Sequence, residues 1–230
     1  IKIGEKYNFL DKPDPRKIIL KKQPVRIGGL AIYFGTMITF LLVIFMGQLN
    51  GNFFNSNDYL LGEKLFNISL ISLFFLLIGL SDDLFNLSPW PRLGMQIIGG
   101  SIAYINGVQI RSLDFSTLPF FSLKIELSLT ISILLTIIWL VGVTNAFNWI
   151  DGLDGLAAGT TVICSIGFAL FSFKENHIFI TSLFAALSGS CAGFLRFNKY
   201  PSKIIMGDGG SYFVGFILAS YGTLVGSNFN

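Results

Sequence analysis

Charged residues are scarce in this 230-residue chain, at 13% of the sequence, whereas 52% of its residues are hydrophobic. A soluble domain of average composition is about 25% charged, so a surface this poor in charge would not stay dissolved in water. The mean hydropathy of +0.67 points the same way. The composition therefore excludes soluble, disordered, collagen-like and coiled-coil classes, and it predicts an integral membrane protein.

Cysteine and histidine are also nearly absent, with two Cys and one His in the chain. Cys164 and Cys191 lie within apolar runs, where they indicate neither a disulfide framework nor a metal cluster. His177 lies in a loop on the side of the membrane opposite to the acidic motifs described below. Zinc hydrolysis and Ser/His or Cys/His catalysis are therefore disfavoured. The net charge of +3 is too small to indicate a nucleic acid as a partner.

Apolar stretches divide the sequence, and each approaches the roughly 17–25 residues that a membrane-spanning helix needs. None of them alternates apolar and polar residues as a strand of a membrane barrel would. We therefore expect an all-α fold, a polytopic transmembrane helical bundle of about seven spans, forming a single domain over residues 1–230. The expected spans lie at 28–49, 65–80, 93–110, 125–143, 156–173, 178–197 and 211–227.

Basic residues lie mainly on one side of this arrangement. The side that holds residues 1–27 carries 12 of the 16 Lys and Arg residues, and most of these lie within 1–27 itself. Cytoplasmic loops carry an excess of Lys and Arg, so this side is predicted to face the cytoplasm.

Four polar motifs stand out, and this orientation places all four on the cytoplasmic side. The first runs from Asp11 through Arg16 and Lys17 and continues to Gly28 and Gly29. It is read either as a positive-inside anchor or as a phosphate site, since Arg and Lys pair with phosphate. The two glycines would let the head of the next helix approach another backbone closely.

The second motif is the pair Asp82 and Asp83, directly after the apolar stretch at 65–80. A helix C-terminus already carries partial negative charge, so two carboxylates there are unfavourable unless a cation lies nearby. A Mg²⁺ ion or a catalytic base explains the pair better than a solvated loop does.

The third motif contains Asn145, Asn148, Asp151 and Asp154. The two Asn residues are three positions apart, as are the two Asp residues, which places each pair on one face of a helical turn. No Lys or Arg lies between residues 125 and 173 to neutralise the acids. Such side chains beside apolar helices are typical of hard-oxygen metal ligands or nucleotide contacts.

The fourth motif runs from Lys203 through Asp208 and Gly209 to Ser211, directly before the last apolar stretch. Glycine amides, a hydroxyl group and a helix N-terminus together favour the binding of a phosphate. Asp208 could hold a divalent ion against that phosphate. A tight turn between helices is the alternative, and the spacing is not that of a Walker A loop.

Carboxylates, Mg²⁺ and basic residues suit phosphoryl-type transfer, in which positioning and charge neutralisation do most of the work. A transporter with cytoplasmic acidic sites is the chief alternative, but it would need ionisable residues within the spans, whereas these acids cluster at their ends. The motif of phosphatidyltransferases does not match either, because Asp151-Gly152 is followed by Leu153-Asp154-Gly155.

The chain resembles the polyprenyl-phosphate N-acetylhexosamine-1-phosphate transferases (glycosyltransferase family 4) over essentially its whole length. The matching motifs are D-x-P-x-x-R-K, P-x-R-x-G-G, D-D-x-x-x-L, N-A-x-N-x-x-D-G-x-D-G-L and N-x-x-P-x-K-x-x-M-G-D-x-G-S, in this order. The resemblance implies a phosphotransferase for substituted phosphate groups that needs Mg²⁺, with Mn²⁺ as a substitute. Its implied reaction moves N-acetylhexosamine-1-phosphate from a UDP-sugar to undecaprenyl phosphate and releases UMP, the first membrane step of cell-envelope glycan synthesis.

The resemblance also implies roles for the acids. Asp208 is expected to bind Mg²⁺, with Asn148 as a second ligand. Asp82 and Asp83 are expected near the metal and the lipid phosphate, with Asp82 deprotonating or positioning the acceptor. Asp151 is expected to contact the nucleotide or the acceptor.

Substrate contacts follow from the same resemblance. Asp154 matches the position that reads the uracil, Asn145 is expected to orient its loop, and Arg92 is expected to touch phosphate. The further substrate-binding candidates are Arg16, Lys17, Lys203, Gly209 and Ser211.

The stretch 24–29, Pro-Val-Arg-Ile-Gly-Gly, resembles the O-antigen and teichoic-acid initiators rather than the lipid I translocase. This favours UDP-GlcNAc or a related UDP-HexNAc over UDP-MurNAc-pentapeptide as the donor. The family's first span and its C-terminal part are missing, so we expect an internal fragment that is inactive alone. The expected setting is the bacterial inner membrane, multi-pass, with the active face in the cytoplasm; a homodimer is compatible with this reading.

Overall fold

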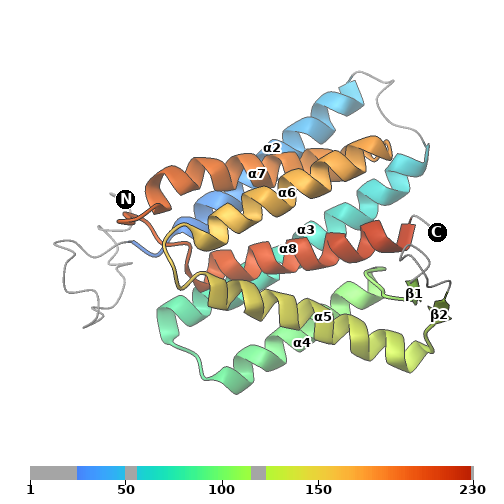
Figure 1. Ribbon diagram of the computed structural model, residues 1–230, viewed down its shortest axis with the longest axis horizontal. Helices are drawn as coiled ribbons and strands as arrows, with labels where there is room; N and C mark the ends of the chain where they lie inside the picture. Colours follow the sequence, from blue (N-terminus) through green and yellow to red (C-terminus); the bar gives the residue numbers. More distant parts are fainter. Residues whose placement is uncertain (1–24, 50–55, 115–122, 229–230) are drawn as a thin grey trace.

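The computed structural model describes residues 25–49, 56–114 and 123–228. Within these ranges, helices run along the long axis of the molecule and a two-stranded hairpin lies at one end (Figure 1). The helices are α2 (Gly28–Leu49), α3 (Ser56–Phe85), α4 (Pro89–Ile105), α5 (Leu129–Ile150), α6 (Leu156–Lys174), α7 (Ile178–Asn198) and α8 (Gly207–Asn228). The strands are β1 (Ser112–Asp114) and β2 (Lys124–Glu126), which pair antiparallel.

The described helices confirm the predicted all-α bundle, and each expected span corresponds to one of them. Within the described residues, five helices are long and apolar enough to cross a membrane, namely α2, α3, α5, α6 and α7. Many of their large apolar side chains face outwards, as expected where the surrounding medium is lipid. The chain is therefore a multi-pass membrane protein.

Several predicted spans differ from the helices that form. The stretch expected at 65–80 lies within the longer helix α3, so Asp82 and Asp83 belong to its last turn and do not follow it. The span expected at 93–110 is a helix that begins earlier, at the Pro89 end, and stops before Asn106 and Gly107. Proline is favoured at the first helical positions, and Gly107 has a φ of +92°, which a helix cannot continue through. The span expected from residue 125 begins instead at Leu129, because residues 124–126 form β2.

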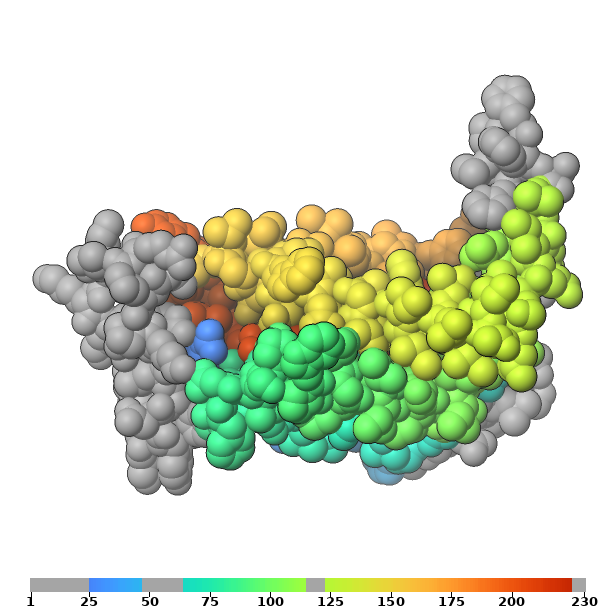
Figure 2. Space-filling model, turned by 90° about the horizontal axis from the view of Figure 1, so that it is seen from below, coloured from blue at the N-terminus to red at the C-terminus, as the bar shows by residue number. Residues whose placement is uncertain are grey.

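Helix α8 lies at the centre of the bundle and packs against α2, α3, α5 and α6. Nearly all of its side chains from residue 209 to 224 are buried, including the large rings of Tyr212, Phe213 and Phe216. Phe216 stacks on Phe75 of α3 with the ring centroids 4.2 Å apart. Helices α4 and α5 cover one face side by side, so little of α8 is visible there (Figure 2).

Glycines allow the start of α8 to lie directly on its neighbours, as predicted for Gly29. A Cβ on Gly29 would collide with the backbone of Gly210, and a Cβ on Gly79 would collide with the backbone carbonyl of Asp208. Small residues at helix contacts permit such close approach in membrane proteins. The result is that the first turn of α8 meets α3 backbone to backbone at Asp208 and meets α2 in the same way at Gly210.

The two ends of the bundle differ. Helices α3, α5 and α7 end where α4, α6 and α8 begin, and we call this end the motif end (Figure 1). The hairpin of β1 and β2 lies at the opposite end, which we call the hairpin end. The short strands were not predicted, since three residues each leave no alternation to recognise.

Candidate functional site

The predicted acidic motifs gather at the motif end, although they come from positions more than a hundred residues apart. Asp82 and Asp83 end α3, Asn148 lies in the last turn of α5, and Asp208 lies in the first turn of α8. Arg16 and Lys17 lie outside the described residues.

Asp83 joins three segments of the chain. Its carboxylate accepts hydrogen bonds from the backbone N–H groups of Asp208 (3.2 Å) and Gly209 (3.1 Å). It also pairs with Arg26 Nη1 at 3.1 Å, and its side chain is 5% exposed. A carboxylate that accepts from the first amides of a helix satisfies donors that have no partner within the helix and complements the helix dipole. Asp83 therefore caps α8, which explains why an acid is tolerated at the end of α3.

Asp82 forms an ion pair with Arg92 Nη1 on α4. The carboxylate side chain is 6% exposed, and the Arg92 side chain is 26% exposed. Arg92 was predicted to touch phosphate, and in this structure its nearest anionic group is Asp82. The pair connects the end of α3 to the start of α4 and leaves the Arg92 side chain partly exposed.

Asn148 connects α5 to α8 at the centre of the site. Its Nδ2 group donates to Asp208 Oδ1 (2.7 Å) and to Ser211 Oγ (3.0 Å). The Ser211 hydroxyl in turn donates to the Asp208 carbonyl at 3.2 Å. The two predicted metal ligands are therefore brought into direct contact, and Ser211 helps to hold them.

Asp151 follows α5 as its C-cap residue and faces the start of α8. Its Oδ2 accepts a hydrogen bond from Gly207 N–H at 3.2 Å. Burial raises the pKa of Asp151 to about 8; the Gly207 amide opposes this shift, and the negative charges of Asp208 and Asp83 add to it. A cation at this position would stabilise the ionised carboxylate, so the environment suits a positively charged ligand.

Asp154 and Asn198 hold the loop after α5 against the loop before α8. Asp154 Oδ2 accepts from Ser202 N–H at 3.0 Å. Asn198 Oδ1 accepts from Gly155 N–H at 3.0 Å, and its Nδ2 donates to the Ile204 carbonyl at 2.9 Å. Asn198 is buried and was not among the predicted site residues, although it is the first residue of the quoted motif N-x-x-P.

Asn145 faces α4 rather than the loop that it was predicted to orient. Its Nδ2 donates to Gln96 Oε1 (2.7 Å) and to the Val141 carbonyl (2.8 Å). Gln96 is buried, so this bond joins α4 to α5 inside the bundle. Gln96 was missed because a lone Gln in an apolar stretch carries no motif.

Lys203 is exposed, and its backbone carbonyl accepts from Val25 N–H at 3.3 Å. This contact lies beside the isolated bridge between Val25 and Ile204, which places Arg26 over the site. Gly209 packs its backbone on Leu80 of α3, so its role here is close packing.

A polar pocket of about 180 Å³ opens at the motif end between α5, α8 and the loops that follow α5 and α7. Asp82, Asp83, Arg92 and Asn145 do not line it. The lining residues are Arg26, Asn148, Asp151, Gly152, Leu153, Asp154, Asn198, Ile205, Gly207 and Asp208.

The described ranges contain no preformed metal site built from protein side chains alone. No group of three or more His, Cys, Asp or Glu side chains within them is placed to hold a metal ion. Any ion at Asp208 would therefore need ligands of other kinds, such as an amide oxygen, water or substrate phosphate.

The fold and the site together define a multi-pass membrane protein with a polar, acid-rich pocket at one end of a helical bundle. A family model described as glycosyl transferase family 4 matches residues 65–226. The chain belongs to this family.

Curated relatives cover most of the chain. It is 33% identical over 95% of its length to a protein of Bacillus subtilis named a probable undecaprenyl-phosphate N-acetylglucosaminyl 1-phosphate transferase, covering 56% of that protein. It is 32% identical over 84% of its length to a phospho-N-acetylmuramoyl-pentapeptide-transferase of Streptococcus pneumoniae, covering 57% of it. A protein of the same name from Streptococcus thermophilus is 28% identical over 86% of the chain, with 59% of it covered. The chain thus spans somewhat more than half the length of these relatives.

Proposed function

We propose that the protein containing this chain transfers N-acetylhexosamine-1-phosphate from a UDP-sugar to undecaprenyl phosphate and releases UMP. The observation that carries the proposal is the contact between Asp208 and Asn148 at the buried N-terminus of α8, beside Asp151 and Arg26. This arrangement combines a helix N-terminus, which favours phosphate, with acids that favour a cation.

UDP-GlcNAc is the proposed donor. The relative from Bacillus subtilis, named for N-acetylglucosaminyl 1-phosphate, is matched over 95% of the chain. The stretch at 24–29, which resembles the initiating enzymes, supports the same choice. In this account the protein lies in the bacterial inner membrane with the motif end in the cytoplasm, where soluble nucleotide sugars are found.

Mg²⁺ fits this site through Asp208, whose carboxylate faces the pocket, and Asn148 as a second ligand. The Asn148 amide nitrogen now faces Asp208 Oδ1, so ligation through its oxygen requires the amide to turn by about 180° around χ2. When bound, Mg²⁺ neutralises charge on the diphosphate.

The pocket of about 180 Å³ would suit a hydrated ion and part of a diphosphate. It is smaller than the roughly 300–1,000 Å³ of sites that enclose a whole drug-sized ligand. The nucleoside and sugar would therefore extend out of it. Asp154 and Asn198 hold the loop at the rim, where a uracil would lie.

Side chains of this chain are proposed to bind and position the acceptor lipid phosphate. A lipid phosphate oxygen attacks the phosphorus attached to the sugar, the bond from that phosphorus to the UMP oxygen breaks, and UMP leaves. Arg92 beside Asp82 is proposed to draw the lipid phosphate to the start of α4. Asp82 and Asp151 are the proposed candidates for positioning the acceptor.

Charge placement argues against the transporter alternative. Among the described helices that could cross a membrane, charged side chains lie at the ends, as with Lys64, Lys174 and Arg196. Coupled transport needs ionisable groups near the middle of the spans.

The test uses membranes that contain the intact gene product, UDP-GlcNAc labelled in the sugar, and undecaprenyl phosphate. Asp208→Asn is expected to lower transfer by about a hundredfold or more, because it removes the anionic ligand. Glu175→Gln is the matched control, since Glu175 is exposed and follows α6 at the other end. Equal transfer rates in wild type and Asp208→Asn would rule out the assigned role.

A further inference from the structure

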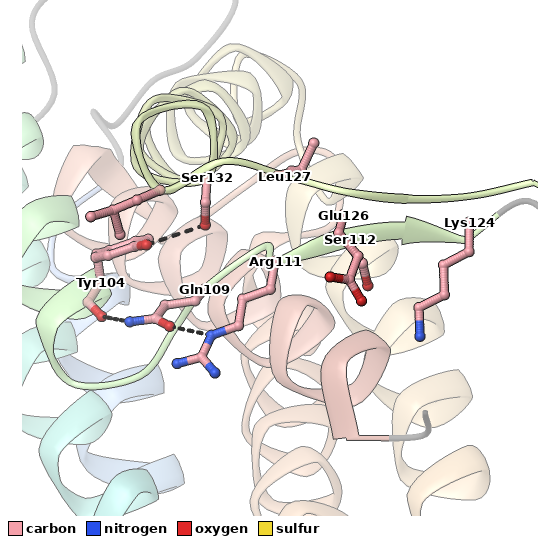
Figure 3. Close-up of a pocket in the computed structure, with 9 residues that line it drawn as sticks. Tyr104, Gln109, Arg111, Ser112, Lys124, Glu126, Leu127 and Ser132 are labelled. Carbon is pink, nitrogen blue, oxygen red and sulfur yellow. Dashed lines mark hydrogen bonds between the residues drawn. The ribbon is translucent and has the colours of Figure 1, made fainter.

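A second polar hollow lies at the hairpin end, far from the motif end, and the proposed reaction makes no use of it. Its volume is about 490 Å³. Figure 3 draws the residues that line it. The hollow lies beside the segment that connects α4 to β1 and the segment that connects β2 to α5. The lining residues are Tyr104, Gln109, Arg111, Ser112, Lys124, Glu126, Leu127, Leu129 and Ser132.

The backbone below this hollow is fixed by α5. Ser132 Oγ donates to the Ile110 carbonyl at 2.7 Å, and Thr136 Oγ1 accepts from Ile110 N–H at 3.0 Å. Ser132 and Thr136 are buried, and Tyr104 donates its hydroxyl to Ser132 Oγ at 3.2 Å. The segment that carries Arg111 is therefore held rigidly against the bundle.

Arg111 is oriented by a chain of hydrogen bonds (Figure 3). Its Nε donates to Gln109 Oε1 at 2.6 Å, and Gln109 Nε2 donates to the Tyr104 carbonyl at 3.0 Å. The Arg111 carbonyl also accepts from Leu127 N–H at 2.9 Å. No carboxylate of the described ranges pairs with the terminal guanidinium nitrogens, which leaves a preorganised fork for an anion such as a phosphate.

The charge of the hollow favours an anion. Arg111 and Lys124 oppose the single carboxylate of Glu126, so the lining carries one net positive charge. Asp114 lies opposite Lys124 in the hairpin register but does not line the hollow. A phosphate diester carries one negative charge and would balance the lining.

An apolar groove continues from the same residues along the bundle. It has a volume of about 400 Å³ and shares Gln109, Arg111 and Ser112 with the hollow. Leu135 and Trp139 of α5 line one side, and Trp139 donates its indole N–H to the Ala219 carbonyl of α8 at 3.2 Å. Trp139 in the groove lies ten positions after Leu129 in the hollow, which corresponds to about 15 Å along α5. The remaining lining residues are Ile110, Leu113, Gly222 and Thr223.

A positively charged hollow joined to an apolar groove is complementary to a phospholipid, which has an anionic headgroup and apolar acyl chains. We propose that the hairpin end binds an anionic phospholipid of the bilayer, with its phosphate on Arg111 and one acyl chain in the groove beside Leu135 and Trp139. Arg111 and the amphipathic hairpin then lie at the membrane surface, where charged headgroups meet acyl chains. The site lies at the opposite end of the helices from the proposed transfer reaction and does not depend on it.

The experiment measures lipids bound to the intact protein by native mass spectrometry after titration with phosphatidylglycerol or phosphatidylcholine. Arg111→Gln is expected to weaken phosphatidylglycerol binding about fivefold, the effect of one basic residue at an anionic surface. Lys174→Gln is the matched control, because it removes one positive charge at the end of α6 on the same side and does not line the hollow. Melting temperatures of both variants are measured to show that they remain folded.

Wild-type protein should also prefer phosphatidylglycerol to phosphatidylcholine, and soluble glycerol 3-phosphate should not displace the lipid, because it cannot fill the groove. The proposal fails if Arg111→Gln binds phosphatidylglycerol as tightly as Lys174→Gln does. Equal binding of the two lipids would contradict the charge argument, and displacement by glycerol 3-phosphate would show a free-phosphate site instead.

Discussion

Replacing Asp83 by Ala is expected to destabilise the bundle at the motif end, because Asp83 caps α8 and pairs with Arg26. Loss of an N-terminal cap costs about 0.5–2 kcal/mol. The ion pair adds about 0.5 kcal/mol, a small value because the Arg26 side chain is 36% exposed and solvent screens it. The sum is about 2 kcal/mol, which corresponds to a melting temperature about 4–8 °C lower for a chain of this size.

The assay is thermal unfolding in detergent, followed for wild type, Asp83→Ala, Asp83→Asn and Glu175→Ala. Asp83→Asn keeps one acceptor oxygen for the amides of α8 and is expected to lose about half as much stability as Asp83→Ala. Glu175→Ala removes an exposed acid at the other end and should melt within about 1 °C of wild type. If Asp83→Ala melts like wild type and yet lacks transfer activity, Asp83 takes part in the reaction and does not stabilise the start of α8.

Three further predictions concern packing, the loops and charge. Gly79→Ala should destabilise the bundle by about 1–3 kcal/mol, because the new Cβ would strike the Asp208 carbonyl. At Gly142 no neighbouring atom lies within 4 Å of an added Cβ, so Gly142→Ala should be neutral or stabilising by up to about 1 kcal/mol. Thermal unfolding of the two variants checks both values. Asn198→Ala should leave the Gly155 N–H and the Ile204 carbonyl without their partner, so hydrogen exchange at the motif-end loops should speed up, and unchanged exchange would contradict this. In chelator-treated protein, the free energy of unfolding should fall as pH rises from about 4 to about 8, because Asp151 binds its proton more tightly in the folded state than in the unfolded state. The Asp151→Asn variant should show a smaller fall over the same pH range. An equal pH dependence in wild type and variant would refute this prediction.

The sequence was sufficient to predict the helices and their common end. Long uncharged stretches such as 28–49 have few alternatives to a membrane helix, and their helical boundaries agree closely. The convergence of the third and fourth motifs also follows from topology, because α5 and α8 run in opposite directions across the membrane. The contact of Asn148 with Asp208 was therefore within reach of sequence reasoning.

The hydrogen-bond and ion-pair partners of single side chains could not be predicted from the sequence. Asp83 accepts from the amides of α8, whereas its neighbour Asp82 pairs with Arg92. Adjacent residues on a helix point in directions about 100° apart, and no pattern in one sequence shows which of the two faces α8. The bond from Gln96 to Asn145 and the pinning of Ile110 by Ser132 depend on the packing of α4 on α5. Such contacts leave no spacing pattern in one sequence.

The central claim is that the whole sugar-1-phosphate moves to the lipid. The most direct measurement supplies the intact gene product with UDP-GlcNAc that carries ³²P in the phosphate next to the sugar. The account predicts that the label appears in the undecaprenyl-linked product and that the UMP released is unlabelled. Label that stays in UDP while the sugar reaches the lipid would show transfer of the sugar alone and would contradict the account.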